Sequence, residues 1–292
     1  CSSRHNLSSP MRTVYRDRLI LDKFVPFETI CIEFQAISMK VKSKNVPAQF
    51  SEIEWFARVE LAACYRLADI FGFSDLIWNH ITSKIPGTKH FLINRFGFRY
   101  DEVTASNLVT IDLDGDVVES GSGTSAEDIN LTGFVIHSAI HAARPDITCV
   151  MHTHSRAGIV VSTLKHGLVP MTIDAMPFYN RVAYHDFEGL SVDLGERTRL
   201  AQALGDQNAM ILCNHGLLTC GKEVSEAFMK MYYLERACEV QLRAQATGQD
   251  IYLPTSDICE KTAMQSNQFS HGAYEWPALL RLVDKTCPDY KT

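Results

Sequence analysis

The sequence predicts an α/β fold in which a mixed β-sheet is covered by helices on both faces. Three observations lead to this class. Stretches with helical periodicity alternate irregularly with short apolar runs, a hairpin signal lies among them, and 46% of the 292 residues are hydrophobic. Such a chain can bury a substantial core, and it contains no internal repeat and no glycine-rich phosphate-binding motif.

The first helix of the core is predicted to begin at Ser51, after a polar linker at 40–50. Ser51 and Glu54 have the spacing of a capping box, in which each side chain pairs with a free backbone N–H group. Gly72 is expected to end the helix. The apolar residues at helical spacing, which should form its buried face, are Phe56, Val59, Ala63, Leu67 and Ile70.

The remaining elements follow from the same periodicities, and Asp114-Gly115 is a favourable hairpin dipeptide. Residues 247–272 are rich in Thr, Ser, Gln and Gly and are expected to form a loop, after which order resumes at Trp276. The predicted elements are strands at 90–95 and 108–113, a helix at 131–143, a strand at 147–154, a helix at 156–165, strands at 209–213 and 217–220, and a helix at 225–246.

Composition excludes several function classes. The net charge of −6 and the pI of about 6.0 favour neither nucleic acid nor an anionic membrane as a partner. No apolar run approaches the roughly 20 residues of a membrane span. Nine cysteines lack CxxC spacing, so we expect them to be reduced and mostly buried, which fits a cytoplasmic protein, with the mitochondrial matrix as the alternative.

The segment 1–49 is expected to be an N-terminal extension of the main domain. Its first 38 residues are rich in Arg and Ser and poor in acidic residues, as mitochondrial targeting segments are. The alternative is an ordered extension that packs on the domain or on a neighbouring subunit.

Histidines carry the clearest chemical signal. His152 and His154 lie two residues apart on a predicted strand, so both side chains leave the same face, roughly 6–7 Å apart at their Cα atoms. That separation allows two imidazoles to converge on one metal ion. His215 is the best candidate for a third ligand, because the turn before Gly216 can aim it into the same site.

The sequence motifs around these histidines resemble those of a known family. RPDITCVMHTHSRAG at 144–158 and NHGLLTCG at 214–221 are similar to the paired signatures of the class II aldolase/adducin family, and AFMKMYYLERACEVQ resembles the helix that follows them. The resemblance covers 50–246 and implies one domain, an α/β/α sandwich with a mixed, largely antiparallel sheet. Residues 247–292 would then be a loop and a tail that packs on this domain.

The adducin-like branch of the family gives the nearest resemblance. Residues 91–118 and 133–146 resemble adducin head domains and small bacterial proteins named as class 2 aldolases. The ending WPALLRLVDKTCPDY is similar to the bacterial proteins rather than to the long basic tail of adducins.

The resemblance also implies a metal site. In the sugar-phosphate aldolases of the family, histidines at the positions of His152, His154 and His215 hold Zn²⁺, and Fe²⁺ or Mn²⁺ would also suit such ligands. In those aldolases, a glutamate about eleven residues before the Arg-Pro-Asp motif acts as acid and base. This chain has Gly133 at that position, and glycine cannot carry a proton.

The substrate pocket implied by the resemblance is altered. Asn79 matches a family asparagine, but Trp78, His80 and Thr82 replace its small neighbours, and Phe96 replaces a hydroxylated residue before Gly97. Leu131 and Thr132 stand where the aldolases have two serines. A phosphorylated substrate is therefore not expected. The substrate-binding candidates are Asn79, Gly97 and Thr132.

Catalytic candidates come from the segment DAMPFYNRVAYHDFEG, where family members bring a tyrosine into the site of an adjacent subunit. They are Tyr179, Tyr184 and His185, and the resemblance implies a homotetramer. His137 and His141, one and two turns after Gly133, are alternative proton carriers unless they are satisfied structural residues.

Two functions remain open on these grounds. The first is a metal-dependent, lyase-like enzyme, a class II aldolase type, acting on a small hydroxy-carbonyl compound. The second is a non-catalytic, adducin-like scaffold module associated with the actin cytoskeleton, which Gly133 and the altered pocket favour.

Overall fold

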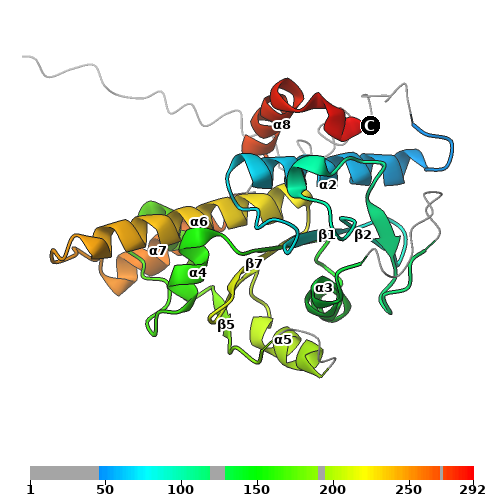
Figure 1. Cartoon of the computed structure of the whole chain (residues 1–292). Helices are drawn as coiled ribbons and strands as arrows, with labels where there is room; N and C mark the ends of the chain where they lie inside the picture. The colour runs from blue at the N-terminus through cyan, green and yellow to red at the C-terminus, as the bar shows by residue number, and fades with distance from the viewer. Residues whose placement is uncertain (1–45, 119–128, 190–194, 270–271) are drawn as a thin grey trace, which may run out of the picture. The chain divides into compact units, whose positions relative to one another are not determined.

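A computed structural model describes residues 46–118, 129–189, 195–269 and 272–292 (Figure 1). The first 45 residues lie outside the described residues, and with them most of the predicted extension and targeting segment. None of the helices in the described ranges combines the length and the apolar composition that a membrane-spanning helix requires.

A single seven-stranded sheet forms the centre of the domain, with the order β3-β2-β1-β4-β7-β6-β5. All neighbouring strands are antiparallel except β5 and β6, which confirms the predicted mixed, largely antiparallel sheet. The strands are β1 (His80–Lys84), β2 (Phe91–Ile93), β3 (Val109–Ile111), β4 (Cys149–Thr153), β5 (Ala183–His185), β6 (Ala209–Leu212) and β7 (Gly216–Gly221).

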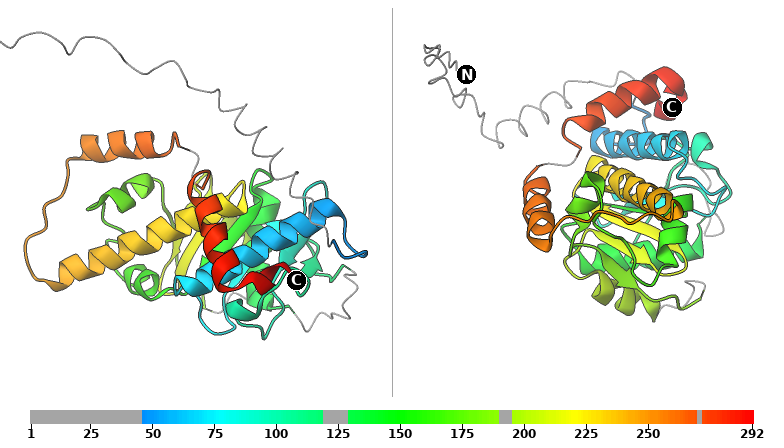
Figure 2. Two further views of the ribbon diagram at one scale, coloured as in Figure 1. Left: turned by 90° about the horizontal axis from the view of Figure 1, so that it is seen from above. Right: turned by 90° about the vertical axis from the view of Figure 1, so that its left-hand side faces the viewer.

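Helices cover both faces of this sheet (Figures 1 and 2). On one face lie α2 (Glu52–Ile70) and α6 (Val224–Ala246), with α8 (Glu275–Thr286) packed outside α2. The opposite face carries α3 (Leu131–Ala143) and α5 (Glu196–Leu204). The shorter elements are α4 (Arg156–Ser162), α7 (Ser256–Ser266), η1 (Tyr100–Glu102), η3 (Ile173–Phe178) and η4 (Pro288–Lys291).

Successive residues of β4 belong to different cores, because strand side chains alternate between the two faces. Cys149 and Met151 join the core under α2 and α6, whereas Val150 joins the core formed with α3 and α5. The same alternation carries His152 to the α3 side and Thr153 to the α6 side, where its hydroxyl donates to the Met231 sulfur at 3.2 Å. The alternation of side chains along β4 therefore decides which helix layer His152 faces.

The start of α2 confirms the predicted N-cap, since the Ser51 side chain accepts a hydrogen bond from the Glu54 N–H group at 3.1 Å. The other half of the predicted capping box is not found among the described contacts, where the Glu54 carboxylate accepts from the Arg58 guanidinium instead. The predicted buried face was wrong at both ends, because Phe56 and Ile70 are exposed. The buried stripe instead includes Arg58, whose guanidinium donates to the backbone oxygens of Ala105 and Leu108 and to Thr110. Apolar periodicity cannot reveal a buried arginine that is satisfied by carbonyls.

The predicted loop at 247–272 contains a helix, α7. Cys259 and Ala263 lie one turn apart and are buried, and α7 packs against η3. The other positions of α7 are mostly polar, so its composition resembles that of a loop. Two small buried residues are enough to fix a helix that packs along one narrow stripe.

Candidate metal centre

The turn between β6 and β7 brings His215 beside the end of β4. Asn214 adopts φ 56°, a left-handed conformation that asparagine tolerates better than most residues. A Cβ atom on Gly216 would lie 2.4 Å from the Thr153 backbone oxygen, so glycine is needed for β7 to approach β4 this closely. The predicted turn at Asn214-His215-Gly216 thus delivers the third histidine to the other two.

The side-chain nitrogens of His152, His154 and His215, which we call the histidine trio, all lie within 4.8 Å of one another. The Nε2 atom of His154 is 3.1 Å from His152 Nε2 and 3.0 Å from His215 Nε2. Ligands at 2.0–2.1 Å around a tetrahedral ion are separated by roughly 3.3 Å, so the observed spacing is close to that of a coordination shell.

The other ring nitrogens of the trio show which atoms are free to bind an ion. His152 Nδ1 lies 3.0 Å from the Leu217 backbone oxygen, and His154 Nδ1 lies 3.0 Å from the Asp75 carboxylate. Both partners can only accept, so Nδ1 carries the proton in each ring and a neutral ring has a lone pair on Nε2. The lone pairs of His152 and His154 would then face each other, and a cation held between the two rings would remove their repulsion. A proton between two of the rings could satisfy one Nε2–Nε2 contact, whereas one divalent ion could bind all three Nε2 atoms.

Burial keeps the trio suited to metal binding. It lowers the pKa of His152 well below the usual value and that of His215 to about 4, and the neighbouring histidines lower both further. These rings are therefore neutral at pH 7, and a neutral imidazole is the form that binds a metal.

A carboxylate from α6 fixes the segment that follows His154. Glu235 accepts hydrogen bonds from the Ser155 hydroxyl at 2.5 Å and from the backbone N–H groups of Ala157 and Gly158. Burial raises the pKa of Glu235, although these hydrogen bonds oppose the shift. Sequence reasoning missed Glu235 because it lies 80 residues from Ser155 in a helix that reads as purely structural.

The loop from Asp75 to His80 borders the trio at both of its ends. Asp75 contacts His154, and the His80 ring lies 5.1 Å from the His152 ring. Between them, Asn79 is 1% exposed, and neither its amide nitrogen nor its amide oxygen has a hydrogen-bond partner among the described residues. An unpaired amide at this depth costs about 1–3 kcal/mol, which a bound water or ligand would offset.

For the other substrate-binding candidates, Gly97 and Thr132, the described residues show no contact with the trio. The Trp78 and Phe96 rings lie 5.9 Å apart, so two aromatic groups meet at the residue next to Asn79 in the chain. Gly97 is exposed at φ 90°, with no atom within 4 Å of a Cβ position. The Thr132 side chain lies outside what the structure describes.

Behind the trio lies a buried chain of hydrogen bonds, which we call the His80 network. His80 Nδ1 is 2.8 Å from His137 Nε2, and His137 Nδ1 is 2.6 Å from the Thr82 hydroxyl, which lies 2.8 Å from His141 Nε2. The His141 ring also stacks on Phe91 at 4.4 Å. His137 and His141 are thus hydrogen-bonded inside the core, and among the described contacts a hydrogen bond joins His137 to His80, the ring that lies beside the trio.

Of the three catalytic candidates, His185 shares a recess with a member of the trio. It lines one small recess with His215, and its Nε2 is 3.4 Å from the Glu196 carboxylate. The Tyr184 hydroxyl accepts a hydrogen bond from the Leu168 N–H group, and Tyr179 ends η3. Within the described part of a single chain, no contact joins either tyrosine to the trio, so a role for them depends on a neighbouring subunit.

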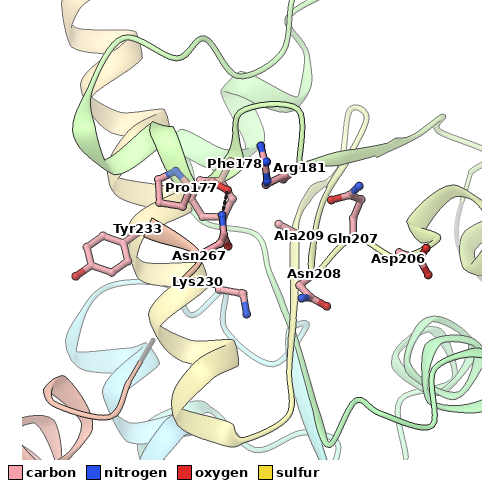
Figure 3. A pocket seen from close by; sticks show the side chains of 10 residues that line it. All are labelled: Pro177, Phe178, Arg181, Asp206, Gln207, Asn208, Ala209, Lys230, Tyr233 and Asn267. Atoms are coloured by element: carbon pink, nitrogen blue, oxygen red, sulfur yellow. Dashed lines mark hydrogen bonds between the residues drawn. The ribbon is translucent and has the colours of Figure 1, made fainter. Parts of the chain in front are cut away.

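A larger pocket lies at the start of β6, whereas His215 follows the end of that strand (Figure 3). Its two cationic groups already have carboxylate partners, since Arg181 pairs with Glu260 and Lys230 pairs with Glu226. None of the candidate site residues lines this pocket. Its lining consists of Pro177, Phe178, Arg181, Asp206, Gln207, Asn208, Ala209, Lys230, Tyr233 and Asn267.

Fold and site together define an α/β/α protein with three converging histidines at one end of its sheet. Comparison with known families agrees, because the profile of the Class II Aldolase and Adducin N-terminal domain matches residues 59–242. The chain therefore belongs to the class II aldolase and adducin family.

Relatives within the family are of two kinds. A Pseudomonas aeruginosa protein with the provisional name of a class 2 aldolase is 44% identical over 253 residues, which is 85% of this chain and 96% of that protein. Alpha-adducin of Rattus norvegicus is 47% identical over 247 residues, covering 79% of this chain but only 33% of the adducin.

Solved structures give the same family. An aldolase II superfamily protein from Pseudomonas syringae is 45% identical with a TM-score of 0.79, covering 83% of this chain and 98% of that one. L-fuculose 1-phosphate aldolase from Glaciozyma antarctica is 30% identical with a TM-score of 0.72, covering 88% and 99% of the two chains.

Proposed function

We propose that this chain is a divalent-metal-dependent, lyase-like enzyme that acts on a small hydroxy-carbonyl compound. The observation that carries the proposal is the convergence of three Nε2 atoms, two of them on rings whose Nδ1 atoms are held by Leu217 and Asp75. A histidine anchored by its second nitrogen is the usual arrangement at metal sites. A bound divalent ion would polarise a carbonyl oxygen and stabilise negative charge formed next to it.

Zn²⁺ is the metal we propose, with Fe²⁺ and Mn²⁺ as alternatives. Three neutral imidazoles suit Zn²⁺ and leave a further position open to a substrate oxygen. Ligand type alone does not separate first-row metals, because availability in the cell also decides which ion is bound.

The residues around the trio suggest what kind of substrate fits. The unpaired amide of Asn79 offers one donor and one acceptor, which suits a hydroxyl or carbonyl group. The contact between Trp78 and Phe96 makes the neighbouring rim apolar, which argues against a phosphate group. With Gly133 unable to carry a proton, the acid and base must come from elsewhere.

Tyr179, Tyr184 and His185 are the proposed sources of that acid and base, acting as residues of an oligomer. The family resemblance implies a homotetramer whose sites lie at subunit boundaries. Sedimentation at micromolar concentration should give a mass several times the 32.8 kDa of one chain. A stable monomer would contradict the shared site.

The experiment that tests the enzyme proposal is a turnover screen. The zinc-loaded protein would be incubated with small unphosphorylated hydroxy-carbonyl compounds, and product aldehydes and ketones would be measured. We expect cleavage that a chelator abolishes and that His154→Ala lacks. Turnover that is equal in chelated protein would contradict metal dependence, and no turnover of any compound would favour the second candidate.

The second candidate function is a non-catalytic scaffold associated with the cytoskeleton. It is favoured by the 47% identity to alpha-adducin and by the absence of any side chain at position 133. Co-sedimentation with filamentous actin tests it directly. Saturable binding by a protein without turnover would establish this reading, and failure to bind would remove it.

A further inference from the structure

His80 lies beside the trio on the neighbouring strand. It pairs with His152 across β1 and β4, so the two side chains leave the same face of the sheet, toward α3. The ring is 2% exposed and 5.1 Å from the His152 ring. Among the described side chains outside the trio, it is therefore well placed to meet a molecule bound there.

Gly133 on α3 makes room for this ring. A Cβ atom at position 133 would lie 2.5 Å from His80 Cδ2, 2.7 Å from Cγ and 2.9 Å from Nε2. Real Cβ contacts are not this short, so a side chain at position 133 and the present His80 ring exclude one another. A helical position that would otherwise favour alanine is thus kept as glycine by the histidine opposite.

The ring cannot easily move away, because His137 holds its Nδ1 atom at 2.8 Å. The Thr82 hydroxyl donates to only one of its two histidine neighbours, so the chain of hydrogen bonds has two directions. In one direction His137 donates to His80 Nδ1, which leaves the proton on His80 Nε2; in the other direction Nε2 carries a lone pair. The network can therefore offer a ligand either a donor or an acceptor with no change of charge.

Two groups at this place lack partners within the described chain. His80 Nε2 has no hydrogen bond, and the neighbouring amide of Asn79 has none on either atom. Two adjacent residues of one segment, both buried and both with a free polar group, are the pattern expected where a ligand completes the hydrogen bonding.

We propose that His80 is a substrate-binding residue, whose Nε2 atom hydrogen-bonds a hydroxyl or carbonyl oxygen of the molecule bound at the trio and whose place is secured by Gly133 and by the His80 network. This inference rests on the proposed function, because the trio must hold a metal for such a ligand to be drawn there. It names the ligand chemistry as a small hydroxy-carbonyl group.

Two substitutions at position 80 distinguish the role of His80 Nδ1 from that of His80 Nε2. His80→Asn keeps a polar atom near Nδ1 for His137 and removes Nε2, whereas His80→Gln keeps a polar atom near Nε2. Each protein would be loaded with Co²⁺ and titrated with glycolate, and binding followed by the visible absorption of the cobalt. We expect His80→Asn to weaken glycolate binding at least about tenfold, with cobalt affinity within about twofold of wild type, and His80→Gln to recover much of the loss. Equal glycolate affinity in wild type and His80→Asn, or no glycolate binding by wild type, would overturn the proposal.

A second measurement needs neither metal nor ligand. Gly133→Ala should lower the melting temperature by at least about 5 °C with His80 present, because the methyl group meets a ring that is held in place. In a His80→Ala background the same change should be neutral or stabilising. An equal effect of Gly133→Ala in both backgrounds would show that the ring does not hold the position described, and the proposal would fall.

The two failures are distinguishable. If wild-type protein binds no cobalt, the metal site and the proposed function fail, and with them the substrate role of His80. If cobalt binds at the trio and glycolate affinity ignores position 80, only the role of His80 fails.

Discussion

Two groups of three histidines lie next to each other in this protein, and they use their ring nitrogens differently. In the trio, the Nε2 atoms converge while the Nδ1 atoms of His152 and His154 are held by Leu217 and Asp75. In the His80 network, the three rings are joined through one another and through Thr82. The partner of the second nitrogen thus distinguishes a group whose converging Nε2 atoms could hold an ion from a group whose ring nitrogens are mostly hydrogen-bonded within the protein.

This difference has consequences for stability and for function. Loss of a trio member should affect metal binding far more than folding, because its Nε2 has no protein partner other than another histidine. Loss of a network member should affect folding more than metal binding, because it leaves buried nitrogens unpaired. Substitutions in the trio should therefore change mainly metal affinity, and substitutions in the His80 network should change mainly the free energy of unfolding.

The largest effect is expected for His154→Ala. His154 Nε2 is central to both short contacts of the trio, so its removal should weaken zinc binding more than about 100-fold, beyond the usual cost of losing an outer partner. Calorimetric titration with Zn²⁺ measures this. His166→Ala, which removes an exposed histidine, is the matched control and should bind zinc like wild type. Unchanged affinity in His154→Ala would show that the trio is not the site.

A smaller effect is expected for Asp75→Ala. It leaves all three Nε2 atoms in place but frees the Nδ1 atom of His154, so zinc affinity should fall by about 10–100-fold. The exposed Asp250→Ala is a control for the loss of one negative charge. If both variants weakened binding equally, general electrostatics rather than the hydrogen bond to His154 would be responsible.

Thr82→Val tests whether the His80 network contributes to folding and not to metal binding. Valine has nearly the shape of threonine but leaves His137 Nδ1 and His141 Nε2 without a partner, which should lower the free energy of unfolding by about 1–3 kcal/mol. Urea denaturation measures the change, and zinc affinity should stay within about twofold. The exposed Thr286→Val should cost less than about 0.5 kcal/mol. A large loss of zinc affinity in Thr82→Val would mean that the two groups are not separate.

The last prediction concerns stability in acid. Burial lowers the pKa of His141 to about 3, below the 6.5 of an unfolded histidine. Below pH 6.5 the unfolded chain therefore binds a proton that the folded chain does not, and stability is lost as the pH falls toward 3. His141→Gln should reduce the slope of unfolding free energy against pH between 6 and 4 by up to about 1.4 kcal/mol per pH unit. An unchanged slope would show that His141 contributes nothing to the loss.

Much of the fold could be predicted because its signals are local. The start of α2, the bounds of α3 and the turn at Asn214 follow from capping, periodicity and glycine placement. Strand β5 has only three residues, and β1 reads HITSK, so neither shows a clear apolar pattern. Helix α7 was missed because only two of its residues are buried.

The candidate site likewise has parts that the sequence predicts and parts that it does not. The trio could be predicted because the sequence places two of its members on one face of a predicted strand and the third in a recognisable turn. The observed strand β4 ends at Thr153, one residue before His154. Asp75, Glu235 and the packing of His80 against Gly133 could not be predicted, because each depends on segments that only the folded chain brings together. His80 was visible in the sequence only as an unusual neighbour of Asn79.

The central claim is that the trio holds one divalent ion, and elemental analysis tests it most directly. The protein would be purified without chelator or affinity nickel, beside a His152→Ala/His154→Ala variant, and its zinc, iron and manganese measured. We expect close to one metal ion per chain in the wild type and almost none in the variant. No bound metal in the wild type, even after incubation with excess zinc, would contradict the claim and would leave the adducin-like scaffold as the better account.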